Sequence, residues 1–306
     1  MILCVTPNPA IDRTLHVKTL QVGEVNRADK VLAVAGGKGL NVARTIQALG
    51  GEPLCMGLIG GHTGNLLEEL AQHEGLSAYW TRMKNETRTC TILVEDGRDA
   101  TVINERGAEV SKEECEVFVH DVWRQAERVQ LVCISGSLPP GFSLGVFDAL
   151  LRGLVKRGKS VWVDTSGAAL KTALKLQRIN IKVNAAELSE ALGMEISNAD
   201  QAIFACRQLL KNGISSVVVT LGKAGAISVN PSGTWTAYPP VIKVVSSVGS
   251  GDAFLGGLVF ALDTDHPLDV SLCHGIAAGA ENALHFGGGN IKRKEFERLL
   301  KEVSLQ

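Results

Sequence analysis

Short apolar runs rich in β-branched residues alternate with amphipathic helical patterns along most of this chain. For example, VQLVCISGS at 129–137 precedes GVFDALLRGLVKRG, SVWVDTS at 160–166 precedes AALKTALKL, and INIKVN at 179–184 precedes AAELSEALG. CMGLIG at 55–60 and SSVVVTLG at 215–222 are further strand-like runs of this series. Strands that are apolar throughout need helices on both faces. The alternation therefore predicts an α/β fold, a doubly wound and mainly parallel sheet.

Two regions interrupt this alternation and predict a second, smaller sheet. TLHVKT at 14–19 and KVLAVA at 30–35 have no helical pattern between them. TCTILVEDGRDATVIN at 89–104 predicts a hairpin that turns at Asp96-Gly97. We expect these segments, about 12–36 and 88–107, to form an antiparallel sheet set apart like a lid. No internal repeat or linker divides the chain, so residues 1–306 are expected to form one domain.

Composition excludes several classes of partner. The formal net charge is −1 over 306 residues, which does not favour nucleic acid or an anionic membrane as a partner. The apolar runs are too short to span a membrane, and MILCVTPNPAID is interpreted as a first strand rather than a signal peptide. Seven scattered cysteines without a CxxC pair predict buried, reduced thiols and a cytoplasmic location.

The stretch VSSVGSGDAFLGG at 245–257 places an acid where a helix begins. The β-branched pair Val244-Val245 predicts a strand that ends in a glycine turn before the helix AFLGGLVFAL. Unpaired N–H groups and the helix dipole favour an anion at such a turn, and glycine allows close approach of a phosphate. Asp252 would lie in the first helical turn beside that anion. The alternative is that Asp252 is an ordinary N-cap.

Other glycine-rich turns occur, but they do not form the common phosphate loops. Lys38 is followed by Gly39, so G-x-x-x-x-G-K-[ST] is absent, and Phe254 breaks G-x-G-x-x-G. AGGKGLNVART at 35–45 opens a helix, whereas SGSLPPG at 135–141 and TLGKAG at 220–225 follow apolar strands. These are the places at which open α/β sheets bind ligands.

AGGKGLNVA together with SSVGSGDAFLGG resembles the two signatures of the ribokinase-like (pfkB) carbohydrate kinases. NPAID, GSLPPG, VDTSG, N-x-x-E and TLGKAG follow the order of that family. Gly37-Lys38-Gly39 and Thr87-Arg88 resemble its hexose-phosphate branch, which comprises 1-phosphofructokinase, tagatose-6-phosphate kinase and the minor 6-phosphofructokinase. The resemblance implies a doubly wound α/β body, a β-sheet lid, ATP as phosphoryl donor and a homodimer formed through the lid.

The resemblance assigns the transfer chemistry to the glycine–aspartate turn. Asp252 would take the proton from the acceptor hydroxyl as its oxygen attacks the γ-phosphorus. The backbone N–H groups of Gly249, Ser250 and Gly251 would hold the transferring phosphoryl group.

The resemblance also implies the sugar contacts. Asp12 would accept hydrogen bonds from sugar hydroxyls, and the Asn41 amide would bind the sugar. Lys38 and Arg88 would clamp the phosphate already on the sugar. Gly37, Gly39 and Ser137 are further substrate contacts. Arg27 and Arg106 are further candidates for phosphate binding, although solvated lid charges are the favoured interpretation of both.

For the nucleotide, Asn184 and Glu187 match the N-x-x-E motif and would hold Mg²⁺ partly through water. Val183 stands where the family usually has proline. The carbonyls of Ser246 and Val248 would be the ligands of a K⁺ ion, which some family members bind. The remaining nucleotide contacts implied are Lys182, Thr220, Gly222 and Gly225, with Asn282 near the adenine.

Together these residues predict ATP-dependent phosphorylation of a ketohexose monophosphate to a bisphosphate. Fructose 1-phosphate is favoured because 1-phosphofructokinase is the commoner activity among similar sequences; tagatose 6-phosphate and fructose 6-phosphate are the alternatives. A sugar-phosphate sensor without activity is a different class, disfavoured because sensing needs no base such as Asp252. A nucleoside kinase is disfavoured by the pair Lys38 and Arg88.

Overall fold

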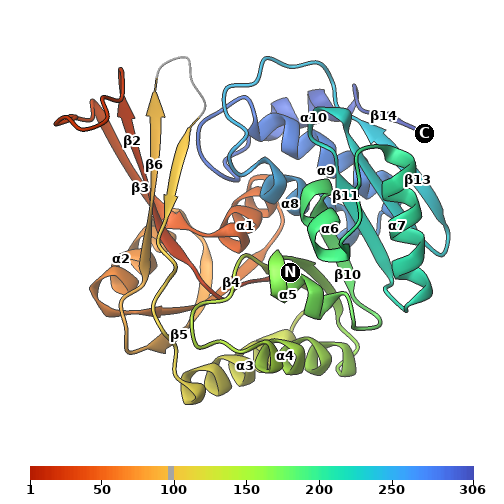
Figure 1. Ribbon diagram of the computed structural model, residues 1–306, viewed down its shortest axis with the longest axis horizontal. Coiled ribbons are helices and arrows are strands. Elements are labelled where there is room, and N and C mark those ends of the chain that lie inside the picture. Colours follow the sequence, from red (N-terminus) through yellow and green to blue (C-terminus); the bar gives the residue numbers. More distant parts are fainter. Residues whose placement is uncertain (96–99) are drawn as a thin grey trace.

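The computed structural model describes residues 1–95 and 100–306, which form two β-sheets flanked by helices (Figure 1). Seven neighbouring strands of the larger sheet, from β11 to β5, run parallel, and β12, β13 and β14 extend it antiparallel. The predicted fold class is confirmed. In spatial order the strands are β14 (Ser304–Leu305), β13 (Gly233–Tyr238), β12 (Ala226–Asn230), β11 (Ser216–Thr220), β10 (Asn180–Asn184), β9 (Ser160–Asp164), β8 (Leu131–Ser135), β1 (Ile2–Thr6), β4 (Pro53–Gly60) and β5 (Ser77–Met83).

Helices cover both faces of this sheet, because its central strands are apolar on both sides. In β1, Ile2 and Cys4 face one core, and Leu3 and Val5 face the other. The first core lies under α1 (Lys38–Ala48), α2 (Gly61–His73), α8 (Ser250–Asp263) and α9 (Leu268–Asn282), with α10 (Arg293–Leu300) packed on α9. The second lies under α3 (Lys112–Ala126), α4 (Leu144–Lys156), α5 (Gly167–Ala173), α6 (Ala185–Leu192) and α7 (Ala199–Lys211).

The smaller sheet stands away from this body as a lid (Figure 1). Its order is β3 (Lys30–Gly36), β2 (Ala10–Val17), β6 (Arg88–Glu95) and β7 (Thr101–Asn104). The hairpin pairing of β6 with β7 is antiparallel as predicted, although its turn at Asp96-Gly97 lies outside the described residues. The central pair β2–β6 is parallel, so the prediction of an antiparallel sheet is wrong there. The chain returns from β3 through α1, β4, α2 and β5, and this excursion lets β6 enter alongside β2 in the same direction.

The predicted strand before the glycine turn is wrong. Residues 239–248 form a loop, and Val244 and Val245 are exposed in it. Pro239 and Pro240 directly follow β13 and cannot donate ladder hydrogen bonds, which favours the end of the strand there. The turn of Gly249 is therefore reached from a loop, although the helix after it, α8, begins where the sequence predicts.

All seven cysteines are free thiols, six of them buried, as the sequence predicts. Within residues 1–95 and 100–306, none of the helices has both the length and the apolar character needed to cross a bilayer.

Candidate active site

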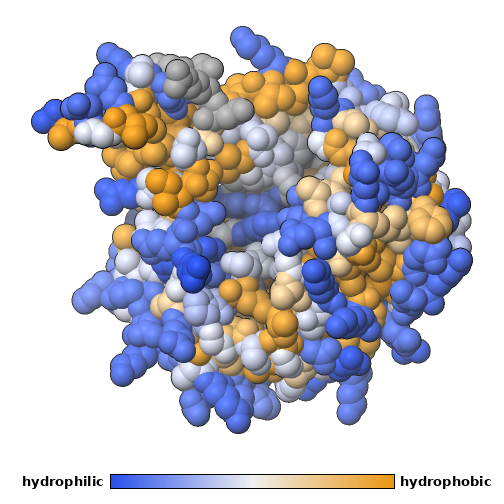
Figure 2. Space-filling view, in the orientation of Figure 1, coloured by the Kyte–Doolittle hydropathy of each residue, from blue (hydrophilic) through white to orange (hydrophobic). Residues whose placement is uncertain are grey.

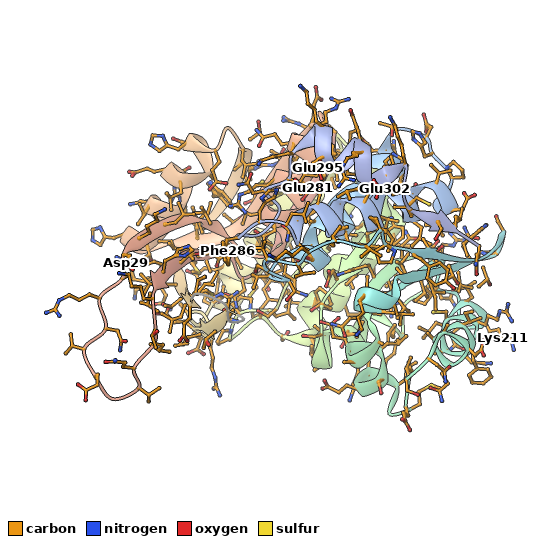
Figure 3. The ribbon with its side chains drawn as sticks, turned by 90° about the horizontal axis from the view of Figure 1, so that it is seen from above. Asp29, Lys211, Glu281, Phe286, Glu295 and Glu302 are labelled. Carbon is orange, nitrogen blue, oxygen red and sulfur yellow. The ribbon has the colours of Figure 1, made fainter. Side chains whose placement is uncertain are left out.

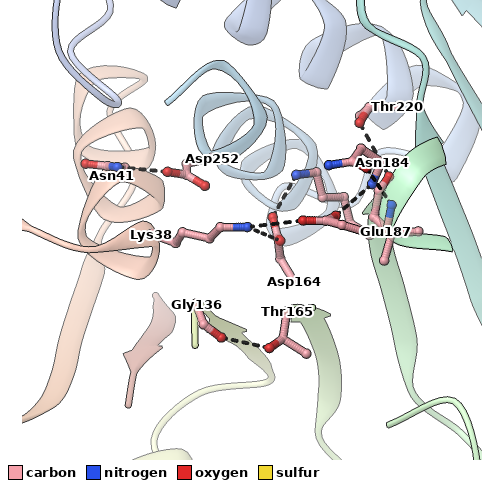
Figure 4. Close-up of polar contacts among 11 residues, drawn as sticks. Lys38, Asn41, Gly136, Asp164, Thr165, Asn184, Glu187, Thr220 and Asp252 are labelled. Atoms are coloured by element: carbon pink, nitrogen blue, oxygen red, sulfur yellow. Dashed lines mark hydrogen bonds and ion pairs between the residues drawn. The ribbon is translucent and has the colours of Figure 1, made fainter. Parts of the chain in front are cut away.

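Many of the predicted functional residues gather where the parallel strands end and α1 and α8 begin (Figure 4), whereas Asp12 and Arg88 lie on lid strands β2 and β6. β9 ends at Asp164, β10 at Asn184 and β11 at Thr220, and these three strands are neighbours in the sheet. In the space-filling view this edge is a hydrophilic hollow between the lid and the body (Figure 2). The position agrees with the general rule for ligand sites in open α/β sheets.

The glycine turn at the start of α8 is built on Gly249. Its φ of 76° is left-handed, and a Cβ there would lie 2.4 Å from the Cα of Gly288, so only glycine fits. The N–H groups of Ser250 and Asp252 already donate to the carbonyls of Ser247 and Gly249, at 3.2 and 3.0 Å. Within the described residues this leaves the N–H groups of Gly249 and Gly251 for an anion, two of the three that the sequence predicts.

Asp252 is buried behind this turn in the first turn of α8. Its Oδ2 accepts a hydrogen bond of 2.8 Å from Nδ2 of Asn41 (Figure 4). Burial raises the pKa of Asp252 to about 6 and the nearby Asp164 adds to the rise, whereas Lys38, Lys182 and the Asn41 amide oppose it. A carboxylate with such a pKa can take a proton at neutral pH and still bind it appreciably, as a general base requires.

Asp164 is a site residue that sequence reasoning missed, although it lies in the quoted motif VDTSG. Its carboxylate is fully buried and receives hydrogen bonds from Lys38 at 2.9 Å and from Lys182 at 2.7 Å. Burial alone would raise the pKa of Asp164, but the two ammonium groups outweigh it and hold that pKa below its usual range. The same contacts, with Asp252 and Glu187, raise the pKa of Lys38 against its burial, so the lysine stays charged.

The predicted clamp of Lys38 with Arg88 is not formed in this structure. The ammonium of Lys38 points into the body at Asp164, whereas the guanidinium of Arg88 stays at the base of the lid. There Arg88 donates to the carbonyl of Asn8 at 2.9 Å and to that of Glu105 at 2.8 Å.

Arg88 lines a cleft of about 680 Å³ together with Ser137 and Arg106. Arg106 is exposed, as expected for a solvated lid charge, and it also lies beside Arg88 and Ser137, which were predicted to contact the substrate. Arg27 is exposed in the loop between β2 and β3, as expected for a solvated lid charge.

A second pocket, of about 480 Å³, lies between the lid and the start of the body. Asp12 of β2 and Asn41 of α1 line it, as predicted for the sugar, and burial raises the pKa of Asp12. Arg44 lines it as well and was not predicted. The loop after α9 closes the pocket; its Phe286 reaches toward the lid (Figure 3) and packs edge-on against His16, with ring centroids 5.3 Å apart.

The two predicted glycines of α1 have packing roles. Gly37 is the N-cap residue with a φ of 114°, and a Cβ on Gly39 would lie 2.3 Å from Oγ1 of Thr6. Glycine at position 39 therefore lets α1 begin directly against the end of β1, which brings Lys38 and Asn41 to the site.

The predicted nucleotide residues Thr220, Gly222 and Gly225 line a mainly apolar pocket of about 450 Å³ on the other side of the glycine turn. Gly251 lies between this pocket and Lys182, whose Nζ would be 3.0 Å from a Cβ on Gly251. This places Lys182 at the end of the pocket where the predicted phosphates would lie.

Asn282, predicted to lie near the adenine, is not among the residues that line this pocket, although Ala280 and Ala283 on either side of it are. Its amide is buried and donates to the carbonyl of Val248 at 2.9 Å and to Oγ of Ser250 at 3.2 Å. Its oxygen accepts the N–H of Gly289 at 2.8 Å. Asn282 thus ties the glycine turn to the loop after α9. Its contact with Val248 uses part of the acceptor capacity of a carbonyl predicted to bind K⁺.

Asn184 and Glu187 form a capping box at the start of α6. The Glu187 N–H donates to Oδ1 of Asn184 at 2.8 Å, and the Asn184 N–H donates to Oε2 of Glu187 at 3.0 Å. Residues 1–95 and 100–306 contain no cluster of three or more His, Cys, Asp or Glu side chains that could hold a metal. Oε1 of Glu187 lies 3.9 Å from Nζ of Lys38 and is partly exposed. One carboxylate oxygen of this kind fits Mg²⁺ bound largely through water and phosphate.

Solved structures with the same fold are carbohydrate kinases. Phosphofructokinase-2 from Escherichia coli, in its tetrameric inhibited form, is 28% identical with a TM-score of 0.92, over 98% of both chains. The same enzyme in complex with fructose-6-phosphate gives 27% identity and a TM-score of 0.90, again over 98% of both chains. A possible 1-phosphofructokinase from Thermotoga maritima is 23% identical with a TM-score of 0.86, over 100% of this chain and 99% of the other. That likeness concerns the fold.

The sequence profile described as pfkB family carbohydrate kinase matches residues 5–295, nearly the whole chain. The match includes both glycine turns, the buried acid Asp252 and the strand ends that carry Asp164 and Asn184. This protein belongs to the pfkB family of carbohydrate kinases and is an ATP-dependent sugar kinase.

Proposed function

We propose that this kinase phosphorylates a ketohexose monophosphate to a bisphosphate, with fructose 1-phosphate as the favoured acceptor. The observation that carries the proposal is the cleft lined by Arg88, Arg106 and Ser137, which opens beside the pocket of Asp12. Arg88 and Asp12 lie on the paired lid strands β6 and β2, with Ala10 opposite Arg88 and Asp12 opposite Cys90, so we expect one small molecule to reach both. An uncharged sugar would not need two guanidinium groups there, whereas a phosphate would.

In the proposed mechanism Asp12 and the Asn41 amide hold the sugar hydroxyls. Asp252 takes the proton of the acceptor hydroxyl while that oxygen attacks the γ-phosphorus of ATP. The bond from this phosphorus to the bridging oxygen breaks, and ADP leaves with its electron pair. The free N–H groups of Gly249 and Gly251 hold the transferring group, and Lys38 and Lys182 oppose its negative charge. When bound, Mg²⁺ neutralises the nucleotide phosphates, and Glu187, with water, is the residue that would hold it.

A panel of acceptors tests this assignment directly. The purified protein is assayed with MgATP and fructose 1-phosphate, fructose 6-phosphate, tagatose 6-phosphate, fructose or ribose, and ADP and bisphosphate are quantified. We expect one phosphorylated ketohexose to exceed every uncharged sugar in kcat/KM by at least about tenfold, the value of one charged hydrogen bond. Equal or better use of ribose or fructose would overturn the proposal. Binding of a phosphosugar without turnover would instead identify the inactive sensor.

Two further properties belong to the same proposal. We expect a K⁺ ion near the carbonyl of Ser246, because phosphofructokinase-2 from Escherichia coli has been solved in complex with potassium. Replacing KCl by tetramethylammonium chloride should then lower activity. We also expect a homodimer formed through the lid. The free thiols favour a reducing compartment such as the cytoplasm, where thiols stay reduced.

A further inference from the structure

Arg44 of α1 is the centre of a partly buried hydrogen-bond network. The network includes Asn41, whose amide is bonded to Asp252, the proposed base. Its Nη1 donates to Oδ1 of Asn41 at 2.7 Å and to the carbonyl of Gly288 at 3.2 Å. Its Nε contacts Glu74, and its Nη2 contacts the carbonyl of Ala35 at the end of β3. The side chain of Arg44 is 11% exposed, so these contacts are shielded from water.

The network connects three separate segments around the site to one side chain. The carbonyl of Ala35 belongs to lid strand β3, and Gly288 belongs to the loop that supports Gly249. Glu74 also accepts the N–H of Ala35 at 3.0 Å, so the carboxylate and the guanidinium hold both backbone groups of that residue. Arg44 is therefore fixed by the lid, the glycine loop and the end of α2 at once.

The chemistry of the partners determines which way the Asn41 amide faces. A guanidinium can only donate, so the oxygen of the amide must face Arg44. An ionised carboxylate can only accept, so the NH₂ of the amide must face Asp252. If the amide turned over, its oxygen would face the carboxylate oxygen of Asp252, and that contact requires a proton between them.

We propose that Arg44 is a positioning residue: it fixes the Asn41 amide with its NH₂ toward Asp252, and so keeps the base ionised and oriented for transfer. The proposal rests on the proposed function only in assigning Asp252 as the base. Arg44 itself is three residues from Asn41 on the same helix and contacts Asp252 only through that amide.

The charges around the base support an effect transmitted through the amide. The groups with the largest effects on the pKa of Asp252 are Lys38 and Asn41 from α1, Asp164 from β9 and Lys182 from β10. The charge of Arg44 lowers the pKa of Asp12, against the effects of burial and of Glu74. A purely electrostatic role of Arg44 would therefore alter Asp12, and any effect on Asp252 would persist when the Asn41 amide is removed.

The decisive measurement is the titration of Asp252, followed by carboxyl ¹³C NMR of aspartate-labelled protein without substrate, with Asp252→Asn used for assignment. In Arg44→Met we expect the pKa of Asp252 to rise by about one unit, the scale of one charged hydrogen bond. Arg44→Lys retains the charge but not the planar fork, so its shift should be smaller. The pH profile of kcat/KM should move by the same amount.

Two comparisons separate positioning from general disruption. Arg124→Met removes an arginine that also bonds an acid and a hydroxyl, Asp121 and Tyr79, but lies on α3 away from the site; it should change neither titration nor activity. In an Asn41→Ala background, Arg44→Met should give no further shift of Asp252, because the amide that transmits the effect is gone.

An unchanged Asp252 titration in a folded Arg44→Met or Arg44→Lys protein would overturn the proposal, as would a full shift in the Asn41→Ala background. If Arg44→Met unfolds, Arg44→Lys decides instead, measured alone and in the Asn41→Ala background. Since the NMR titration needs no sugar, failure of every ketohexose phosphate as a substrate would refute the proposed function without affecting this result.

Discussion

The body and the lid differ in how firmly they hold their functional groups. In the body, buried Asp164, Lys182 and Asp252 form one charge cluster with the partly exposed Lys38, above a sheet covered by helices on both faces. In the lid, the outer strand β7 is exposed along its whole length. The difference indicates a division of work. In the proposed function the body carries the phosphoryl-transfer chemistry, and the lid carries groups such as Asp12 and Arg88 that would recognise the acceptor.

The largest effect should come from the body. Asp252→Asn removes the base while keeping its shape, and we expect turnover to fall by roughly 10²–10⁴-fold, the usual contribution of a positioned base. ATP affinity, measured by calorimetry, should change little. Asp121→Asn is the control, because Asp121 also accepts hydrogen bonds in the body but lies away from the site. Near-normal turnover of Asp252→Asn would end the assignment of this residue as the base.

A pair of charge deletions should separate the body from the lid. Lys38→Met removes a cation held at Asp164 and should lower kcat by about 10²-fold, as for one transition-state donor. Arg88→Met removes a cation of the lid cleft and should raise KM for the phosphosugar roughly 10- to 150-fold. Steady-state kinetics with each substrate varied gives both values. If Lys38→Met raises only the KM for the phosphosugar, the interpretation changes. Lys38 would then leave Asp164 when the phosphosugar binds and form the predicted clamp with Arg88.

The pH dependence of kcat/KM should also reflect a group of the body, Asp252. Asp252 acts as a base only when ionised, and burial raises its pKa to about 6. Activity should therefore be level above that pH and fall as pH decreases through it, approaching tenfold per unit. The measurement is kcat/KM between pH 5 and 8, with circular dichroism at each pH to show that the protein stays folded. If kcat/KM instead falls only near pH 4, the surroundings stabilise the charged carboxylate of Asp252 more than its burial indicates.

The smallest effect on the folded chain should come from the lid surface. Val31, Leu32, Val102 and Ile103 are 42–57% exposed, and apolar side chains gather over the lid in Figure 2. Val31→Thr with Ile103→Thr should weaken the proposed dimer in sedimentation velocity while changing the stability of the chain by only about 0.5 kcal/mol. Phe204→Ser, an exposed apolar residue on α7, is the matched control on the body. A wild-type protein that is monomeric at all concentrations would contradict the lid interface.

Local pattern determined most of the fold. The alternation of apolar strands and amphipathic helices predicts the parallel sheet because each strand must be covered on both faces. The glycine turn predicts the start of α8 and the position of Asp252 because a left-handed residue and a free helix end are local properties. The paired valines 244–245 misled, because β-branched residues indicate a strand only where a neighbour can pair with them, and Pro239-Pro240 end β13 before that point.

The sequence by itself therefore determined the fold class, the family and the position of Asp252 at the start of α8, since each depends on residues close together in the chain. The tertiary structure decided which charges meet. Asp164 joins Lys38 across 126 positions, Asn41 joins Asp252 across 211, and Arg44 joins Gly288 across 244. The parallel pairing of β2 with β6 and the use of Asn282 within the turn depend likewise on packing between distant segments. The spacing of apolar residues in the sequence shows which side of one helix or strand is buried. A hydrogen bond between two elements depends instead on how the fold brings their ends together.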